Sequence, residues 1–181
     1  MQAFKWEPAD TNAPTGSASL EPGGYVLKIT GVEDNEHVSS PYLAITYDIA
    51  EGEHMGHYSD EWGQQHEWAH QMRWYYTEKS MWRFNKNLTA LAETNPGFDP
   101  QAFAAAPDPR KLIGLLVGGI IQKRYYTNSY GDDKEALEVA DVVSAAAIRA
   151  NDFELPEPRD NRAKTTPAPV ASTASLDDLP F

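Results

Sequence analysis

Two segments near the start of the chain alternate apolar and polar residues with the two-residue period of a β-strand. The first covers residues 25–30 and follows the turn sequence Pro22-Gly23-Gly24. The second covers residues 42–49, and its apolar side chains on one face are Leu43, Ile45, Tyr47 and Ile49. This alternation predicts two strands of a sheet with one buried face. The pair Glu51-Gly52 then predicts a turn into a third extended segment around residues 57–62.

The middle of the chain carries one expected helix with strands on both sides. Residues 72–76 are rich in aromatic side chains and predict a strand. Thr77 has the chemistry of a helix N-cap, and the apolar residues after it recur with helical spacing, at Met81, Phe84, Leu88 and Leu91. Residues 111–148 predict two further strands joined by a turn at 128–133. The order favours a mainly β domain, namely a five-stranded OB-fold barrel with a helix inserted between strands 3 and 4, although a mixed α+β sandwich gives a similar order.

Changes in composition divide the chain into four parts. Residues 1–19 are small, polar and proline-containing, which predicts an extended lead-in, and residues 20–154 carry the expected domain. Residues 155–175 contain four prolines and almost no large apolar side chain, so they bury too little surface to fold and predict a disordered linker. Large apolar residues return at 176–181, in the sequence LDDLPF. A short apolar tip at the end of a flexible tether is typical of a segment that binds a partner.

The charge of the chain restricts how it can bind nucleic acid. The formal net charge is −12, and there is no cysteine. Disulfides, thiolate metal sites and cysteine nucleophiles are therefore excluded, and a cytoplasmic protein is expected. No run of 18 apolar residues predicts a membrane span, and the first residues do not resemble a secretory signal. A nucleic-acid binder usually carries basic surface, so any such surface here must be local.

Aromatic and basic residues are interleaved in two segments of this otherwise acidic chain, 73–86 and 123–130. Binding of single strands without sequence preference uses aromatic faces for the bases and positive charge for the phosphates. The candidate nucleic-acid-binding residues are Arg73, Trp74, Tyr75, Tyr76, Lys79, Trp82, Arg83, Lys86, Lys123, Arg124, Tyr125, Tyr126 and Tyr130. Strand alternation allows only one of the pairs Arg73/Tyr75 and Trp74/Tyr76 to face a ligand, and Arg73/Tyr75 is the favoured pair. The competing interpretation is that the aromatic residues belong to the core and that the basic residues on the helix form an ordinary solvated face.

A metallopeptidase is the main alternative. The sequence HEWAH at 66–70 matches H-E-x-x-H, in which two histidines on one helix face bind zinc and the glutamate, here Glu67, acts as general base. Glycine and glutamine flank the motif where a zincin helix is apolar, and the strand expected at 72 leaves little room for a long helix. The expectation is therefore a protein without catalytic activity, cofactor or metal. A non-catalytic metal contact remains an open alternative at His54, His57, His66 or His70.

The end of the chain resembles that of bacterial single-stranded DNA-binding proteins, which close on acidic residues followed by a hydrophobic residue, proline and phenylalanine. Their order of OB-fold, linker and tip matches the order expected here. The segments LEPGGYVLKITGVE, YLAITYDIAEGEHMG and KLIGLLVGG, with a tryptophan-bearing helix, are more similar to phage-encoded members of the family. The resemblance implies coating of single-stranded DNA in replication or recombination, in the cytoplasm of a bacterial host.

The resemblance also implies a role for the tip. Phe181 and its carboxylate would enter an apolar pocket of a replication or recombination protein, Pro180 and Leu179 would shape the tip, and Asp177 and Asp178 would contact a basic rim. The tip has two acids where the cellular proteins often have three or more. A third interpretation is an interaction adaptor that acts through the tip and does not bind DNA. The sequence leaves the oligomeric state open, including a homo-oligomer.

Overall fold

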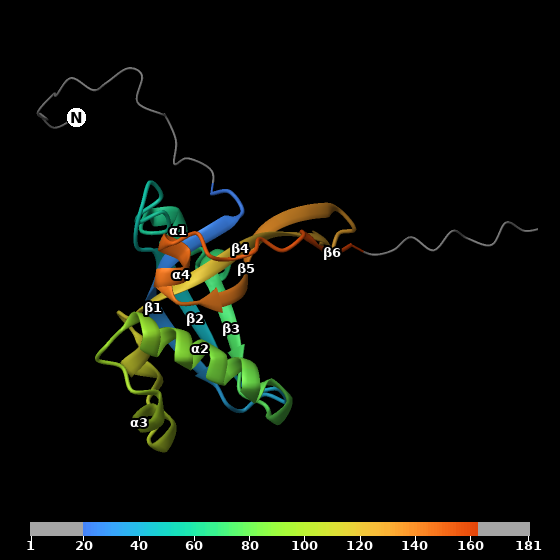
Figure 1. The fold of residues 1–181 in the computed structure, drawn as a ribbon. Coiled ribbons are helices and arrows are strands. Elements are labelled where there is room, and N and C mark those ends of the chain that lie inside the picture. Colours follow the sequence, from blue (N-terminus) through green and yellow to red (C-terminus); the bar gives the residue numbers. More distant parts are fainter. Residues whose placement is uncertain (1–19, 163–181) are drawn as a thin grey trace, which may run out of the picture.

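The computed structural model describes residues 20–162, and its main element is a six-stranded sheet. Five antiparallel strands follow the order β3-β2-β1-β4-β5, and β6 is added in parallel beside β4 (Figure 1). The strands are β1 (Gly23–Asn35), β2 (Tyr42–Ile49), β3 (Gln71–Tyr75), β4 (Leu116–Thr127), β5 (Asp133–Val143) and β6 (Arg159–Asn161). The expectation of a mainly β domain is therefore confirmed.

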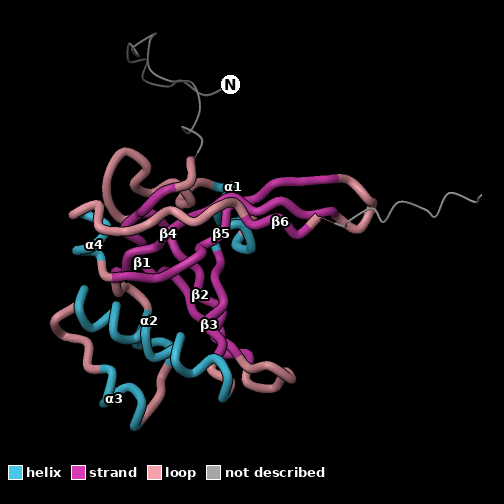
Figure 2. Tube along the Cα trace, turned by 45° about the vertical axis from the view of Figure 1, so that its right-hand side comes forward, coloured by secondary structure: helices cyan, strands magenta, loops and turns pink. Residues whose placement is uncertain are grey.

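Four short or medium-length helices connect these strands. They are α1 (Glu61–Gln65), α2 (Met81–Thr94), α3 (Pro100–Ala105) and α4 (Ala145–Arg149). The helix α2 follows β3 and precedes β4, as expected for the inserted helix, and it lies with α3 at one end of the sheet (Figure 2). Among residues 20–162, no helix is both long enough and apolar enough to cross a lipid bilayer.

The alternation in the first two strands produces the buried face of the sheet. Leu27 and Ile29 in β1 are fully buried, while Lys28 and Thr30 between and after them are exposed. All four apolar residues predicted on one face of β2 are buried as well. The largest side chains without solvent exposure are Tyr47, Leu27, Ile29, Ile45, Ile49, Leu91, Leu112, Ile121 and Val117. The core therefore lies on the concave side of the sheet, where α2 contributes Leu91.

The predicted start of the helix is wrong in detail. Leu88 and Leu91 pack in the core and Phe84 is partly buried against it, but Met81 is 39% exposed. Thr77 does not cap α2, because a 3-10 turn at Glu78–Ser80 separates the two. The Thr77 hydroxyl oxygen lies 2.9 Å from that of Ser80. Neither Thr77 nor Ser80, the residue directly before α2, makes a side-chain hydrogen bond to a backbone N–H of the turn that follows it.

The segment at 57–62 is not the strand that the sequence predicted. It forms turns and the first residues of α1. The carboxylate of Asp48 accepts a hydrogen bond from the backbone N–H of Tyr58 at 2.9 Å, and the carboxylate of Asp60 accepts one from Gly63 at 2.7 Å. These two carboxylates satisfy backbone groups that a neighbouring strand would otherwise have to satisfy. Asp60 is thus the N-cap of α1.

The sheet is open between β3 and β5. Within the described chain β3 pairs with β2 alone and β5 pairs with β4 alone, although the two strands approach each other across the concave side. The closed barrel expected from the sequence is therefore not confirmed. The turn predicted at 128–133 is confirmed: Asn128 Oδ1 accepts backbone hydrogen bonds from Tyr130 at 3.0 Å and Asp132 at 2.8 Å.

The described structure continues past residue 154, where the sequence placed the end of the domain. Residues 159–161 form β6, which pairs with Arg124–Tyr126 in the part of β4 that extends beyond its pairing with β1. Figure 1 shows the β4–β5 hairpin projecting from the rest of the sheet with β6 beside it. The lead-in at 1–19 and the tip at 176–181 lie outside the described residues, as does the linker from residue 163 onward.

Two glycines in β4 allow close packing. A methyl group added to Gly119 would collide with the side chain of Leu27, and one added to Gly118 would meet Ile148 and the carbonyl oxygen of Ser144. Both glycines are buried, and they are the pairing partners of Tyr25 and Val26 in β1. Both glycines therefore allow β4 to lie in close contact with β1 and with the segment around α4.

We expect Gly119→Ala to lower the free energy of unfolding by about 1–3 kcal/mol, because Leu27 is fully buried and has no free space to move into. Chemical denaturation with urea measures this change. Gly97→Ala is the control, since a methyl group there meets no atom within 4 Å. Equal stability of the two variants would contradict the packing described.

Candidate nucleic-acid interface

The strand β3 divides its aromatic and basic residues between the core and the surface. Trp74 is 3% exposed and belongs to the core, while Tyr75 is 37% exposed and Arg73 lies on the same outward face. Register places Tyr42 of β2 opposite Tyr75, and their ring centroids are 5.2 Å apart. The Arg73 guanidinium lies 5.0 Å from the centre of the Tyr42 ring. The favoured pair Arg73/Tyr75 therefore faces solvent, joined by Tyr42, which the sequence had not singled out.

Trp74 and Tyr76 are not available as stacking surfaces. The Trp74 ring packs in the core, 6.4 Å from the ring of Phe84. Tyr76 is partly buried and donates a hydrogen bond from its hydroxyl to Asp34 at 2.6 Å. Partial burial, together with this hydrogen bond, raises the pKa of the Tyr76 hydroxyl. Neither ring is therefore available to stack on a base, because their apolar surface serves the core.

The helix α2 presents a second, separate set of candidates. Trp82 is 68% exposed, Arg83 beside it is exposed as well, and Lys79 is exposed in the 3-10 turn just before the helix. Arg83 donates a hydrogen bond to the backbone oxygen of Ala140 at 3.2 Å. Lys86 lies 2.7 Å from Asp141 Oδ1 of β5, so its charge is neutralised by that carboxylate. Of the candidate basic residues Lys79, Arg83 and Lys86, only Lys79 and Arg83 have a charge that no carboxylate of the described chain pairs.

The candidates on the β4–β5 hairpin are also largely paired with acids. Lys123 lies 3.5 Å from Glu135, and Arg124 lies 3.5 Å from Glu138. Tyr126 lies below the Arg124 guanidinium at 5.0 Å. Tyr125 is half-buried, and the Arg162 guanidinium lies 5.3 Å from the centre of its ring. Tyr130 at the hairpin tip is 90% exposed. The excess of basic residues along β4 is thus offset by the acidic residues that β5 places across from it.

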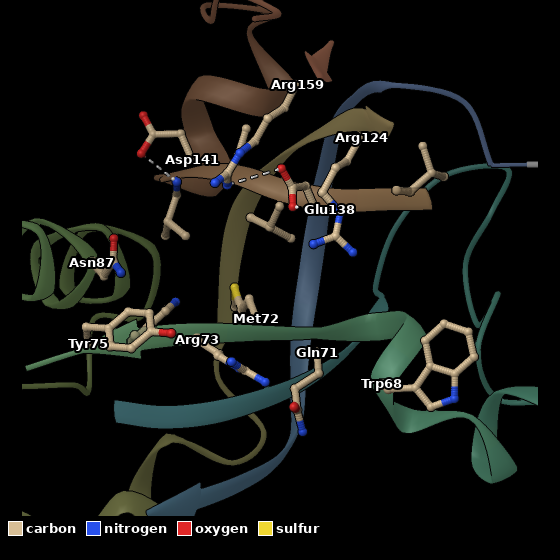
Figure 3. Close-up of a pocket in the computed structure, with 15 residues that line it drawn as sticks. Trp68, Gln71, Met72, Arg73, Tyr75, Asn87, Arg124, Glu138, Asp141 and Arg159 are labelled. Carbon is tan, nitrogen blue, oxygen red and sulfur yellow. Dashed lines mark hydrogen bonds and ion pairs between the residues drawn. The ribbon is translucent and has the colours of Figure 1, made fainter. Parts of the chain in front are cut away.

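Two hollows that share walls form one groove along the open side of the sheet. The first, the β3–β5 slit, has a volume of about 440 Å³ and lies between the free edges of those strands. The second, about 430 Å³, lies under α1 and the hairpin. Trp68, Arg124 and Leu137 line both. Figure 3 shows Met72 at the centre of the slit, with Tyr75 and Asn87 toward one end and Trp68 at the other.

Three aromatic rings that were not among the candidate nucleic-acid-binding residues lie at one end of this groove. Trp62 and Trp68 are 51% and 68% exposed, and His66 stacks on Trp62 with ring centroids 4.6 Å apart. Trp68 meets the other two rings edge-on at 6.5 and 5.9 Å. We call these three residues the aromatic platform. A sequence signal was present, because Trp62 and Trp68 stand among glutamine and glutamate residues that have no reason to be buried.

The slit contains buried polar groups that make no hydrogen bond in the described structure. Trp74 Nε1 and Arg124 Nε are two such groups, although Arg124 Nε lies 3.5 Å from Glu138 Oε2 in an ion pair. Asn87 of α2 is 5% exposed and lines the slit, and its side chain has no hydrogen bond to any described residue. A buried donor left unpaired costs about 1–3 kcal/mol. Groups of this kind at one cavity indicate a place where a ligand or solvent completes the structure.

The HEWAH sequence has a structural role in the fold. It forms a 3-10 turn, not a long helix, and His66 Nδ1 lies 2.7 Å from the carbonyl oxygen of Trp62. Both ring nitrogens of the buried His70 lie within hydrogen-bonding distance of carbonyl oxygens, those of Tyr47 and Gly63. Between residues 20 and 162 no group of three histidines or carboxylates is placed to hold a metal ion. The geometry therefore does not support zinc hydrolysis through this motif, nor a metal contact at the neighbouring His54 and His57.

Buried and half-buried side chains beside the groove have shifted pKa values. Burial, and then the charge of Asp48, raises the pKa of Tyr58 to about 12. Partial burial, followed by the neighbouring His54, lowers the pKa of His57 below its ordinary value of 6.5. The folded protein thus disfavours protonation of His57, while the unfolded chain does not. Its contribution to stability is complete above about pH 6.5 and is lost as the pH falls toward the lower value in the folded state.

We expect His57→Gln to weaken the loss of stability on acidification. Between pH 7 and pH 5, the wild-type free energy of unfolding should fall more steeply than that of the variant, because only the wild type must protonate this ring. Urea denaturation at each pH measures both curves. His37→Gln is the matched control, since the side chain of His37 is 92% exposed. Parallel curves for the wild type and His57→Gln would contradict the prediction.

Comparison with known proteins gives no independent assignment. No protein-family model matches the chain, and no curated protein matches its sequence. The functional assignment therefore depends on the groove, on the aromatic platform and on the resemblance carried by the sequence motifs.

Proposed function

We propose that this chain binds single-stranded DNA along the groove, without catalysis and without a cofactor. The observation that carries the proposal is the aromatic platform beside Arg124 and Arg73, because exposed aromatic faces next to arginines are what single strands require. Two tryptophans exposed by half or more and packed against each other also have no evident structural purpose. Burial of their exposed apolar surface by a bound ligand would contribute favourably to the free energy of binding.

The fold supports the same proposal. The strand order β3-β2-β1-β4-β5, with a helix between β3 and β4, is the order of an OB-fold barrel, here open between its third and fifth strands. We therefore propose that the domain is an OB-fold of the type found in phage-encoded single-stranded DNA-binding proteins. Its role would be to coat and protect single strands in replication or recombination, in the cytoplasm of a bacterial host. The tip would recruit other proteins to that complex, and a homo-oligomer is compatible with this role.

An interaction adaptor is the second candidate, favoured by the ion pairs. Lys86, Lys123 and Arg124 each have a carboxylate partner, and the formal charge of the chain is −12. A domain whose basic residues are neutralised attracts phosphate weakly. Salt dependence separates the two candidates, since phosphate contacts weaken as salt rises and apolar docking does not.

The proposal is tested with oligo-dT and two tryptophan variants. We expect Trp68→Ala to weaken binding by about 5- to 100-fold, the value of one base stacked on an aromatic ring. Fluorescence anisotropy of labelled oligo-dT at low and high salt measures the affinity. Trp82→Ala is the matched control, because Trp82 is equally exposed but lies on α2, outside the groove.

Each result of this comparison has a defined meaning. A larger loss with Trp82→Ala would move the interface from the groove to α2 and its residues Lys79 and Arg83. No binding by the wild type at low salt would reject the proposal and leave the adaptor as the remaining candidate.

The proposed tip has a separate prediction. Deletion of Phe181 should leave the affinity for oligo-dT unchanged or slightly higher, because the acidic tip competes with phosphate for basic sites instead of binding DNA. The same anisotropy titration measures it. Loss of DNA binding in the variant that lacks Phe181 would show that the tip itself takes part in DNA binding.

A further inference from the structure

The β3–β5 slit is lined by polar groups that make no hydrogen bond within the described chain. Trp74 Nε1 can only donate a hydrogen bond, as can Arg124 Nε, which lies 3.5 Å from Glu138 Oε2, and the Asn87 amide supplies both a donor and an acceptor. All three residues come from different elements, β3, β4 and α2, so the fold brings them together. The occupant of this slit must therefore present acceptors to the protein.

The neutral polar groups of the slit are buried, whereas its arginines lie at the surface. Trp74 and Asn87 are 3% and 5% exposed, whereas Arg73 and Arg159 line the same hollow and are exposed to solvent. Arg159 Nη1 lies 3.8 Å from Glu138 Oε1, so a phosphate would have to compete with that carboxylate for Arg159, while Arg73 has no ion pair in the described chain. A phosphate alone would be expected to meet the arginines at the mouth and would leave the buried neutral groups unpaired. A nucleotide satisfies both sets, because its base can enter while its phosphate stays outside.

We propose that one nucleotide of the bound strand inserts its base into the β3–β5 slit, and that the site selects bases with carbonyl oxygens over adenine. This inference rests on the proposed binding of single-stranded DNA and adds one selective position to otherwise sequence-tolerant binding. The base lies against Met72 and Val139 of the two facing strands, and its carbonyl edge accepts from Trp74 Nε1 and the Asn87 amide. Arg73 and Arg159 hold the phosphate.

The chemistry of the bases explains the order of preference. Thymine carries two carbonyl oxygens, while adenine has ring nitrogens beside an amino group that donates. A donor-only group such as the Trp74 indole can pair with any carbonyl oxygen but repels the adenine amino group. The Asn87 amide can adapt to either base by itself, but beside a carbonyl edge held by Trp74 Nε1 it donates to that same edge, so both residues contribute to the selection.

The indole N–H resonances of the full-length protein test the insertion directly. In a ¹H–¹⁵N spectrum the Trp74 signal is assigned from its loss in Trp74→Phe. We expect oligo-dT to shift this signal downfield, as a new hydrogen bond does, and oligo-dA of equal length to shift it much less. If oligo-dT shifts the signals of Trp62 and Trp68 but leaves that of Trp74 in place, the insertion is wrong and the proposed function survives. If no indole signal responds to oligo-dT, both fail.

The selectivity has its own variant and control. Asn87→Leu keeps the approximate size of the side chain and removes the amide, so the ratio of the dissociation constants for oligo-dA and oligo-dT should fall about tenfold. Asn85→Leu makes the same change on the exposed side of the same helix and should leave the ratio unchanged. An unaltered ratio in Asn87→Leu, in a variant that still binds oligo-dT, would overturn the role of Asn87 in selection.

Discussion

The pairing of β1 along both of its edges is the constraint on which the rest of the structure depends. This 13-residue strand pairs with β4 through residues 23–28 and with β2 through residues 27–35, with an irregularity in register between Ile29 and Gly31. Its two neighbours therefore overlap only around Leu27 and Lys28. Because β2 and β4 extend in opposite directions from that point, the strands they carry at their outer edges, β3 and β5, curve toward each other without joining. The groove exists because β1 divides its length in this way.

Local sequence predicts this architecture where a local pattern decides the outcome. Alternation identified the buried faces of β1 and β2, and the polar turn at 128–133 marked the hairpin, since Asn128 makes its hydrogen bonds within that turn. The segment at 57–62 was mispredicted because its backbone is satisfied by Asp48, a residue from another strand. The contact between Asp48 and Tyr58 forms only when the chain folds, so a local sequence pattern does not reveal it. For the same reason the sequence could not show whether β3 and β5 would meet.

The candidate site was harder to predict than the fold, because exposure and charge balance depend on neighbours across the sheet. Alternation allowed only one of the pairs Arg73/Tyr75 and Trp74/Tyr76 to face a ligand, and the structure places the favoured pair, Arg73/Tyr75, on the exposed face of β3. Lys123 and Arg124 counted as available charges in the sequence, whereas Glu135 and Glu138 on β5 neutralise them. Phosphate at this surface would have to compete with carboxylates for the same guanidinium and ammonium groups. Binding by such exchange would be weaker than the number of basic residues suggests, and more of its strength would come from stacking.

His70 has a consequence for the aromatic platform that lies beyond its own contacts. Its ring joins the carbonyl oxygen of Tyr47 in β2 to that of Gly63 in α1, and stacks on Tyr58 at 4.5 Å. The loop that carries Trp62, His66 and Trp68 is therefore tied to the sheet at a buried point. Rings held in place before a ligand arrives lose little conformational freedom when it binds, so more of the stacking energy remains as affinity. His70, which resembles a metal ligand in the sequence, would thus favour binding by reducing the conformational entropy that Trp62 and Trp68 lose when a ligand binds.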